Sequence, residues 1–391
     1  MDFRFTEEEE QLRREVVDFL RKEVTPDIVA EVRECYRSYD MWAPLTSNII
    51  RKIGAKGWLV PHWPKEYGGL GSSHMATFMT HDEMAYFGLP DIFMGALWCG
   101  PIIMREGSDE LKEEFLLPLA KGEIEFALGY SEPEAGCDLA AIQLRAEDKG
   151  DYFLLNGQKI FSSSARFAKY HFLAARTDWE IPQKHRGISL MIVDLKSPGI
   201  TIEPMPTMSG WAGNRVFYNN VRVSKKYLLG ELNRGFYYLM AALDRERMFM
   251  PGMWRRLFEN LVDYTKEAKR NGRPLRQDPL VRQKLAQIAT ELEVSRLLYY
   301  RIAYLVEKGE AQAYHSSLEK WFWSEMIQHL TNTGMQIMGL YGQLRKGSKW
   351  APLSGDIELY YRRTVGDTIA AGTNEIQRSI IALRGLGLPT S

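Results

Sequence analysis

Residues 151–164 read DYFLLNGQKIFSSS, and this stretch predicts how the middle of the chain folds. Two runs of apolar and β-forming residues flank Asn156-Gly157, an arrangement that is the strongest short-range signal for a β-hairpin. We therefore expect a hairpin with its turn at these two residues. Four further short runs follow: YHFLAART (170–177), GISLMIVDL (187–195), GITIEPM (199–205) and NRVFYNNVRV (214–223). The sequence predicts a small antiparallel β domain over residues 123–228.

Helical patterns lie on both sides of this β domain. Near the start, Thr6 and Glu9 form a capping-box pattern ahead of apolar residues at helical spacing. After Gly230 an apolar stripe of helical period returns. The stripe consists of Val281, Leu285, Ile288, Leu292, Leu298, Ile302 and Leu305. We expect a mainly α protein with a β domain, in which residues 1–122 form an N-terminal helical domain and residues 229–391 a C-terminal helical bundle.

Composition limits the classes of partner and the cellular location. The chain has 50 basic and 50 acidic side chains, so no global field attracts nucleic acid. Its three cysteines are odd in number and lack CxxC spacing, which argues against a disulfide framework or a zinc knuckle. The acidic N-terminus has no targeting pattern, and no segment approaches the roughly 20 apolar residues of a membrane span. We expect a cytoplasmic protein without membrane insertion.

The densest polar cluster is LGYSEPEAGCDLA (128–140), at the entry to the β domain. The chain has no GxGxxG after a strand, no GxxxxGK[ST], no HExxH and no GxSxG. This excludes the simplest nucleotide-hydrolase, zinc and serine-hydrolase interpretations, and no metal site is predicted. Taken alone, the cluster is typical of a solvated surface loop. Its combination with other segments indicates a site.

Four motifs are spaced along nearly the whole chain. They are YSEPEAGCDLA (130–140), NGQKIFSSS (156–164), ALDRER (242–247) and GTNEIQRSII (372–381), supported by PKEYGGLG (64–71) and MQIMGLYG (335–342). Together they resemble the acyl-CoA dehydrogenase family. The resemblance implies an FAD-containing enzyme that acts on an acyl-CoA thioester, with a helical, a β and a second helical domain in that order.

The resemblance also assigns cofactor contacts. The expected FAD contacts are Leu128, Tyr130, Ser131, Cys137, Phe161, Ser163, Arg270, Gln336, Gly339, Thr373 and Glu375. Gln336 and Gly339 resemble the segment that one subunit supplies to its neighbour's FAD, so a homo-oligomer, and a tetramer in particular, is implied. Cys137 and Phe161 replace the commoner Ser and Trp, and a thiol is a weaker hydrogen-bond donor than a hydroxyl.

The loop around residue 270 departs further from the family pattern. Many members grip the FAD pyrophosphate with an Arg and a Phe, whereas this chain has Ala268 and Asn271 at those places. Arg270 or Arg273 substitutes for them, or the segment is simply an exposed basic loop. Both alternatives stay open.

The catalytic base is not at the family's common position. Many members carry a carboxylate just before the Gly372-Thr373 pair, but this chain has Ala371 there. Glu246 resembles an alternative base position, and Pro251 is expected to kink the helix beside it. Asp91 stands at the start of an apolar helix, where it is either an N-terminal cap or a desolvated proton acceptor. Both carboxylates are candidates.

Substrate contacts follow from the same resemblance. Asp244 and Arg247 fall where the family binds the CoA arm, and Cys137 falls near the thioester. Leu97 and Trp98 belong to the helix that lines the acyl pocket in this family.

This chain has a carboxylate at position 91 and an alanine at position 371. In this combination it resembles the branch of the family that acts on alicyclic acyl-CoAs in anaerobic aromatic metabolism. Its substrate cyclohex-1-ene-1-carboxyl-CoA has no α-proton and yields the 1,5-diene by 1,4-elimination, with an electron-transfer flavoprotein or similar acceptor taking the electrons. Three alternatives stay open. They are α,β-dehydrogenation of a short, branched or cyclic saturated acyl-CoA with Glu246, a non-catalytic FAD-binding partner subunit, and a flavin monooxygenase on the same fold.

Overall fold

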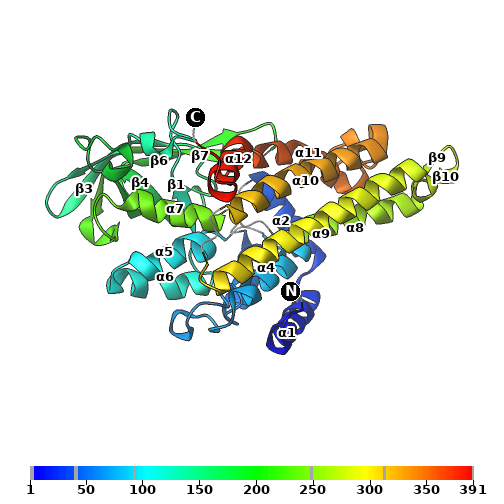
Figure 1. Ribbon diagram of the computed structural model, residues 1–391, viewed down its shortest axis with the longest axis horizontal. Coiled ribbons are helices and arrows are strands. Elements are labelled where there is room, and N and C mark those ends of the chain that lie inside the picture. The colour runs from blue at the N-terminus through cyan, green and yellow to red at the C-terminus, as the bar shows by residue number, and fades with distance from the viewer. Residues whose placement is uncertain are drawn as a thin grey trace.

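The computed structural model describes residues 4–38, 43–90, 93–210, 212–246, 250–310 and 314–389. Helices make up the first and last parts of the chain, and a sheet makes up the middle. In Figure 1 the sheet lies at one end of the molecule, while the long helices of the C-terminal part extend toward the other. The mainly α fold with a β region is confirmed.

The N-terminal part consists of α1 (Glu7–Glu23), α2 (Pro26–Ser38), α3 (Pro44–Gly54), α4 (His74–Tyr86), α5 (Gly100–Glu106) and α6 (Asp109–Ala120). The expected capping box opens α1, because the Thr6 hydroxyl accepts from the Glu9 N–H at 3.2 Å and the Glu9 carboxylate accepts from the Thr6 N–H at 2.9 Å. Residues 76–85 of α4 are all buried, and this helix packs against α1, α8 (Gly252–Glu267) and α9 (Pro279–Glu307). It therefore ties the two helical parts together.

The sheet consists of β1 (Phe126–Gly129), β2 (Arg145–Asp148), β3 (Tyr152–Lys159), β4 (Tyr170–Arg176), β5 (Ile188–Asp194), β6 (Ile200–Pro206), β7 (Ala212–Ser224) and β8 (Leu228–Leu229). Its strand order is β6-β7-β3-β2-β4-β5-β8, with β1 also paired to β4. The sheet is mixed and not purely antiparallel as expected, because β1 and β2 both run parallel to β4. They follow one another along the same edge of β4, and residues 130–144 leave the sheet between them.

The expected hairpin turn at Asn156-Gly157 is wrong. These residues lie inside β3, where the pairing with β7 shifts register between Leu155 and Gly157. The Asn156 side chain accepts from the Asn220 N–H at 2.9 Å, and a Cβ on Gly157 would stand 3.0 Å from the Leu144 Cα. Asn156 stands opposite two residues of β7, Asn219 and Asn220, so the extra residue of this bulge lies in β7. Asn156-Gly157 continue β3, since pairing with the long strand β7 on both sides outweighs the local turn preference.

The C-terminal part consists of α7 (Gly235–Glu246), α8 (Gly252–Glu267), the short β9 (Lys269–Arg270) and β10 (Arg273–Pro274), α9 (Pro279–Glu307), α10 (His315–Met338), α11 (Asp356–Asp367) and α12 (Asn374–Ile380). Met250 and Pro251 are not helical, so an interruption near Pro251 is present before α8 begins at Gly252. Within the described ranges, no helix has the length and apolar character needed to cross a membrane.

The apolar stripe of α9 is buried except at one predicted position. Leu298 is only partly buried, and Tyr299 takes its place in the core at 2% exposure. Alternating steps of three and four residues from Leu292 pass through Ser295 and Tyr299 to Ile302, so the stripe includes a serine and a tyrosine that an apolar count passes over.

Candidate functional site

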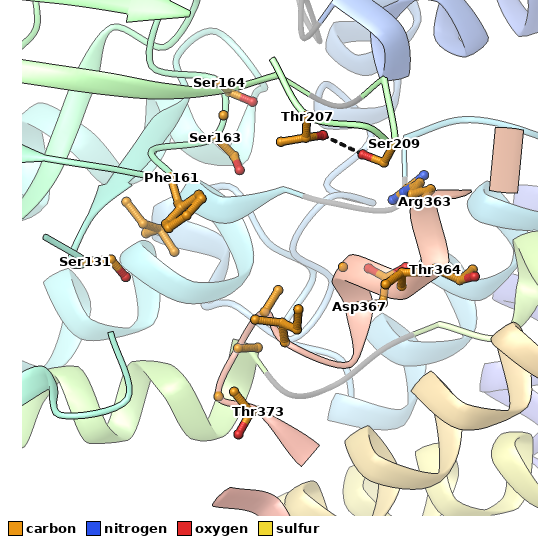
Figure 2. Close-up of a pocket in the computed structure, with 18 of the residues that line it drawn as sticks. Ser131, Phe161, Ser163, Ser164, Thr207, Ser209, Arg363, Thr364, Asp367 and Thr373 are labelled. Carbon is orange, nitrogen blue, oxygen red and sulfur yellow. Dashed lines mark hydrogen bonds between the residues drawn. The ribbon is translucent and has the colours of Figure 1, made fainter. Parts of the chain in front are cut away.

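A cavity of about 1220 Å³ lies where the three parts of the chain meet. Its wall takes side chains from the segment before α5, from the loops at the ends of β1 and β3, and from α11 with the turn that follows it. In Figure 2, Ser131 and Phe161 lie on one side of this space, and Thr364 and Asp367 of α11 lie on the other. Sequence segments more than 200 residues apart thus share one site.

The loop after β1 is held by a buried ion pair. The Glu132 carboxylate accepts from the backbone N–H groups of Gln143 and Leu144, at 2.6 and 2.9 Å, and from the Lys159 ammonium at 2.7 Å. Lys159 also donates to the Tyr130 carbonyl at 3.0 Å. Burial lowers the pKa of Lys159 to about 8, although Glu132 opposes that effect. These contacts fix Tyr130 and Ser131 against the end of β3.

Phe161 presents an aromatic ring to the cavity from an unusual backbone conformation. Its φ is +56°, in the left-handed region, and its side chain is 61% exposed. The next residue, Ser162, is fully buried and exchanges backbone and side-chain hydrogen bonds with Asn214 at 3.1 and 2.8 Å. The fold therefore anchors Ser162 and leaves the neighbouring ring facing open space.

A buried histidine of the sheet contacts the loop that contains Phe161 and Ser163. In β4, His171 contacts the Ser162 hydroxyl through Nε2 at 3.1 Å and hydrogen-bonds the Tyr218 hydroxyl through Nδ1. Burial lowers the pKa of His171 to about 3, so the imidazole is neutral at physiological pH. The loop residues Phe161 and Ser163 thus rest on a polar network beneath them.

The turn before α12 forms another part of the wall. Ala371 has a φ of +55° and Gly372 one of +84°. The buried Gln377 donates to both of their carbonyls, at 3.1 and 3.0 Å, and the Thr373 hydroxyl caps α12 by accepting from the Ile376 N–H at 3.4 Å. The turn therefore carries a methyl group, and no carboxylate, to the cavity at position 371.

The structure brings some of the predicted cofactor and substrate residues together at the cavity and places others elsewhere. Those on the cavity wall are Trp98, Leu128, Tyr130, Ser131, Cys137, Phe161, Ser163 and Thr373. Three others lie together at the far end of the C-terminal helices, where Arg270 donates to the Ile337 carbonyl at 3.0 Å, Gln336 accepts from Lys284, and Gly339 ends α10. None of these three lines the cavity.

Two further predicted residues lie off the cavity wall. Glu375 is exposed on the first turn of α12, where the backbone lowers the pKa of its carboxyl. Leu97 is partly buried and packs against the cores of both helical parts.

The candidate bases cannot be placed in this cavity from the described residues. Asp91 and Arg247 lie outside the described ranges. Asp244 and Glu246 belong to the last turns of α7, and their side chains also lie outside the described part of the structure.

Several wall residues were missed in the sequence. Thr207 and Ser209, joined at 2.7 Å in Figure 2, follow β6 and belong to no recognisable motif. Asp367 comes from α11, where a helical pattern gave no sign of a site. Glu125 is a buried acid one residue before β1, and its only sequence signal is a charge next to a short apolar run.

Comparison with known proteins places this architecture in a family. Three family models match consecutive parts of the chain: the acyl-CoA dehydrogenase N-terminal domain at 6–123, the middle domain at 127–221 and the C-terminal domain at 233–386. The chain belongs to the acyl-CoA dehydrogenase family. It is therefore an FAD-dependent oxidoreductase that acts on CH–CH bonds.

Its relatives span its whole length. Acyl-CoA dehydrogenase FadE26 of Mycobacterium tuberculosis is 34% identical, covering 100% of this chain and 99% of the relative. A subunit of the caffeyl-CoA reductase-Etf complex of Acetobacterium woodii, CarC, is 30% identical, covering 97% and 98%. The solved Tcur3481-Tcur3483 steroid ACAD is 34% identical with a TM-score of 0.91, and the match covers 100% of both chains.

The residues present fit FAD. An exposed aromatic ring held at positive φ beside two serine hydroxyls suits a planar, hydrogen-bonding ring system, and the cavity is large enough for a sizeable part of the cofactor and an acyl group. When bound, FAD supplies the acceptor for the two electrons that leave the acyl chain.

Proposed function

We propose that this acyl-CoA dehydrogenase oxidises a cyclic acyl-CoA, with cyclohex-1-ene-1-carboxyl-CoA as the parent substrate and the cyclohexa-1,5-diene thioester as product. The observation that carries this proposal is Ala371, which brings a methyl group to the cavity at the position where a carboxylate would remove an α-proton. In the cyclohexene thioester the α-carbon carries no proton. The apolar side chains of Phe93, Met94 and Trp98 on the cavity wall suit a ring.

The chemistry needs a carboxylate at a new place. A base at C3 of the ring takes the proton that the conjugated double bond acidifies, while the hydride equivalent leaves C6 and completes a 1,4-elimination. We assign this base to Asp91. The backbone around Tyr130 and Ser131, fixed by Glu132 and Lys159, would hold the thioester in position. This matters because a small displacement of the reacting carbon from the base lowers the rate by a large factor.

An α,β-dehydrogenation of a saturated cyclic or branched acyl-CoA is the second candidate. It is favoured by Glu246, the last described residue of α7, and by similarity to a solved enzyme described as a steroid ACAD. In this case Glu246 would take the α-proton, and Asp244 and Arg247 would contact the CoA arm.

We propose that FAD is shared between subunits. The wall residues Tyr130, Ser131, Phe161 and Ser163 would contact the flavin, whereas the group formed by Arg270, Gln336 and Gly339 would reach the cofactor of a neighbouring subunit. Their separation from the cavity within one chain supports this arrangement. The predicted tetramer is one such assembly.

Other assemblies and partners follow from the relatives. The name of the solved Tcur3481-Tcur3483 steroid ACAD combines two proteins. This supports a hetero-oligomer as the alternative to a homotetramer. In such an assembly the present chain could be a non-catalytic partner subunit. The Etf complex of CarC supports an electron-transfer flavoprotein as electron acceptor. A cytoplasmic location stays a prediction.

The test is flavin reduction under anaerobic conditions. Purified holoenzyme is mixed with cyclohex-1-ene-1-carboxyl-CoA, with saturated cyclohexane-1-carboxyl-CoA and with a linear butyryl thioester, and flavin absorbance is followed. We expect the cyclohexene thioester to bleach the flavin fastest. Faster bleaching by the saturated ring favours the Glu246 mechanism, and no bleaching by any thioester contradicts an independent catalytic role.

A further inference from the structure

Glu125 is a buried carboxyl on the cavity wall that the proposed chemistry leaves without a role. It directly precedes β1, and only 8% of its surface is exposed. Phe93, Met94 and Trp98 line the same cavity. Because removing a carboxylate from water is costly, buried carboxyls are normally held by partners.

The fold satisfies one of its two oxygens. Oε1 accepts from the Gly95 N–H, at the start of the π-helical turn Gly95–Cys99, and from the Phe126 N–H at 2.8 Å. A Cβ at position 95 would stand 2.6 Å from this oxygen, so the glycine is what allows the carboxyl to approach. Turns of π-helix inserted in helices are frequent at functional sites.

The other oxygen, Oε2, accepts no hydrogen bond from the residues that the structure describes. Burial raises the pKa of Glu125 to about 7 against the effect of the two N–H donors, and no charged side chain of the described residues contributes to the shift. A side chain that lines the cavity therefore keeps one strong acceptor that no described residue uses. Held by two backbone groups, that acceptor is fixed in place.

We propose that Glu125 selects the acyl group, with Oε2 accepting a hydrogen bond from a hydroxyl on the ring away from the thioester. This inference rests on the proposed function, because it takes the cavity as the binding site of a cyclic acyl-CoA. A hydroxyl fits better than an ammonium group, since the apolar wall would impose a far larger desolvation cost on a charge. A ring-hydroxylated member of the proposed substrate class is thus preferred over the unsubstituted parent.

The proposal is tested by binding, separately from turnover. Holoenzyme is reduced with dithionite, so that no thioester can be oxidised, and titrated calorimetrically at pH 8 with cyclohexane-1-carboxyl-CoA and its 4-hydroxy and 4-oxo derivatives. We expect the 4-hydroxy thioester to bind roughly ten- to a hundredfold more tightly than the 4-oxo thioester, because a ketone presents a second acceptor to the carboxylate.

Glu125→Gln supplies the matched variant. Its amide oxygen can still accept from Gly95 and Phe126, while the NH₂ group replaces the free acceptor with a donor. The preference for the hydroxyl over the ketone should therefore vanish or reverse. Glu123→Gln, the same change at an exposed residue off the cavity wall, should leave the preference intact.

The outcomes separate this inference from the proposed function. Equal affinity of the wild-type enzyme for the hydroxy and oxo thioesters, or an unchanged preference in Glu125→Gln, overturns the role of Glu125 alone. No binding of any of the three thioesters overturns the proposed substrate class and this inference with it. The wild-type comparison decides the matter even if Glu125→Gln fails to fold.

Discussion

At the scale of single residues, the position of one carboxylate separates the two candidate reactions. Ala371 lines the cavity within a turn that Gln377 holds by two hydrogen bonds, so no small movement brings an acid there. The proton acceptor must come from another element, and Asp91 and Glu246 are the proposed sources. Each assignment of the base predicts which mutation lowers turnover more.

Asp91→Asn keeps the size and most of the capping capacity of Asp91 but removes the base. If the 1,4-elimination operates, turnover of cyclohex-1-ene-1-carboxyl-CoA should fall by roughly 10²–10⁴-fold while FAD content stays at the wild-type level. Steady-state kinetics and flavin absorbance measure both. Glu246→Gln is the control, and should lower turnover far less; the reverse order of losses assigns the base to Glu246.

At the scale of elements, two buried polar groups hold the loops that line the cavity. Lys159, the last residue of β3, joins the loop after β1 through Glu132 and the Tyr130 carbonyl. His171, in β4, supports the loop after β3 through the Ser162 hydroxyl. Both depend on strand pairing that brings distant segments together, so both should contribute to stability as well as to the shape of the site.

Lys159→Met should destabilise the protein by about 3–5 kcal/mol, because it leaves the buried Glu132 carboxylate without its cation. Urea unfolding measures this cost. Adding Glu132→Gln should recover part of it, since a neutral amide oxygen can still accept from the Gln143 and Leu144 N–H groups. A cost below about 1 kcal/mol for the single variant would show that the pair is not a structural anchor.

His171 should make stability depend on pH in the acid range. Its pKa is about 3 in the fold against 6.5 in the unfolded chain, so the unfolded state binds the proton first. This contribution is present above pH 6.5 and is lost, by about 1.4 kcal/mol per pH unit, as pH falls toward 3. Urea unfolding between pH 7.5 and 5 should show a flatter pH dependence for His171→Asn.

Ser162→Ala is the control for this titration. It removes the hydroxyl that His171 contacts but keeps the imidazole, so it should lower stability by a similar amount at every pH. An unchanged slope in His171→Asn would mean that other groups set the acid dependence. The buried His81, with a pKa lowered to about 4, is present in both variants and therefore cancels.

At the scale of the whole molecule, the cofactor residues predicted for one site lie in two places. The cavity group includes Ser131, Phe161 and Thr373, whereas Arg270, Gln336 and Gly339 lie at the far end of the C-terminal helices. A second subunit resolves this separation if its far end approaches the first subunit's cavity. Cofactor retention and assembly should then be coupled.

Arg270→Ala should lower the FAD content per chain without altering the cavity of its own subunit. Flavin absorbance after gel filtration measures the content, and sedimentation velocity measures the assembly. Arg276→Ala, a change at another exposed arginine six residues further on, is the control and should retain FAD. A fully loaded monomer, or equal retention in both variants, contradicts a shared cofactor.

The sequence by itself determined the order of the three parts and the family, because helical periodicity, short strand runs and spaced motifs are local signals. It also singled out Tyr130, Ser131, Phe161 and Ser163, which sit within those motifs and line the cavity; their contact with FAD stays a prediction. It misjudged Asn156-Gly157, where pairing with β7 keeps both residues inside a strand. The turn preference of Asn-Gly contributes little free energy, so long-range strand pairing outweighs it.

Only the tertiary structure decided which residues share the cavity. The parallel placement of β1 and β2 along β4, the approach of α11, and the contact between Glu125 and Gly95 all join segments that are distant in the chain. No pattern in a single segment encodes such a contact, because it depends on the backbone of one element meeting the side chain of another. Glu125 is therefore unremarkable in the sequence and buried beside a ligand cavity in the fold.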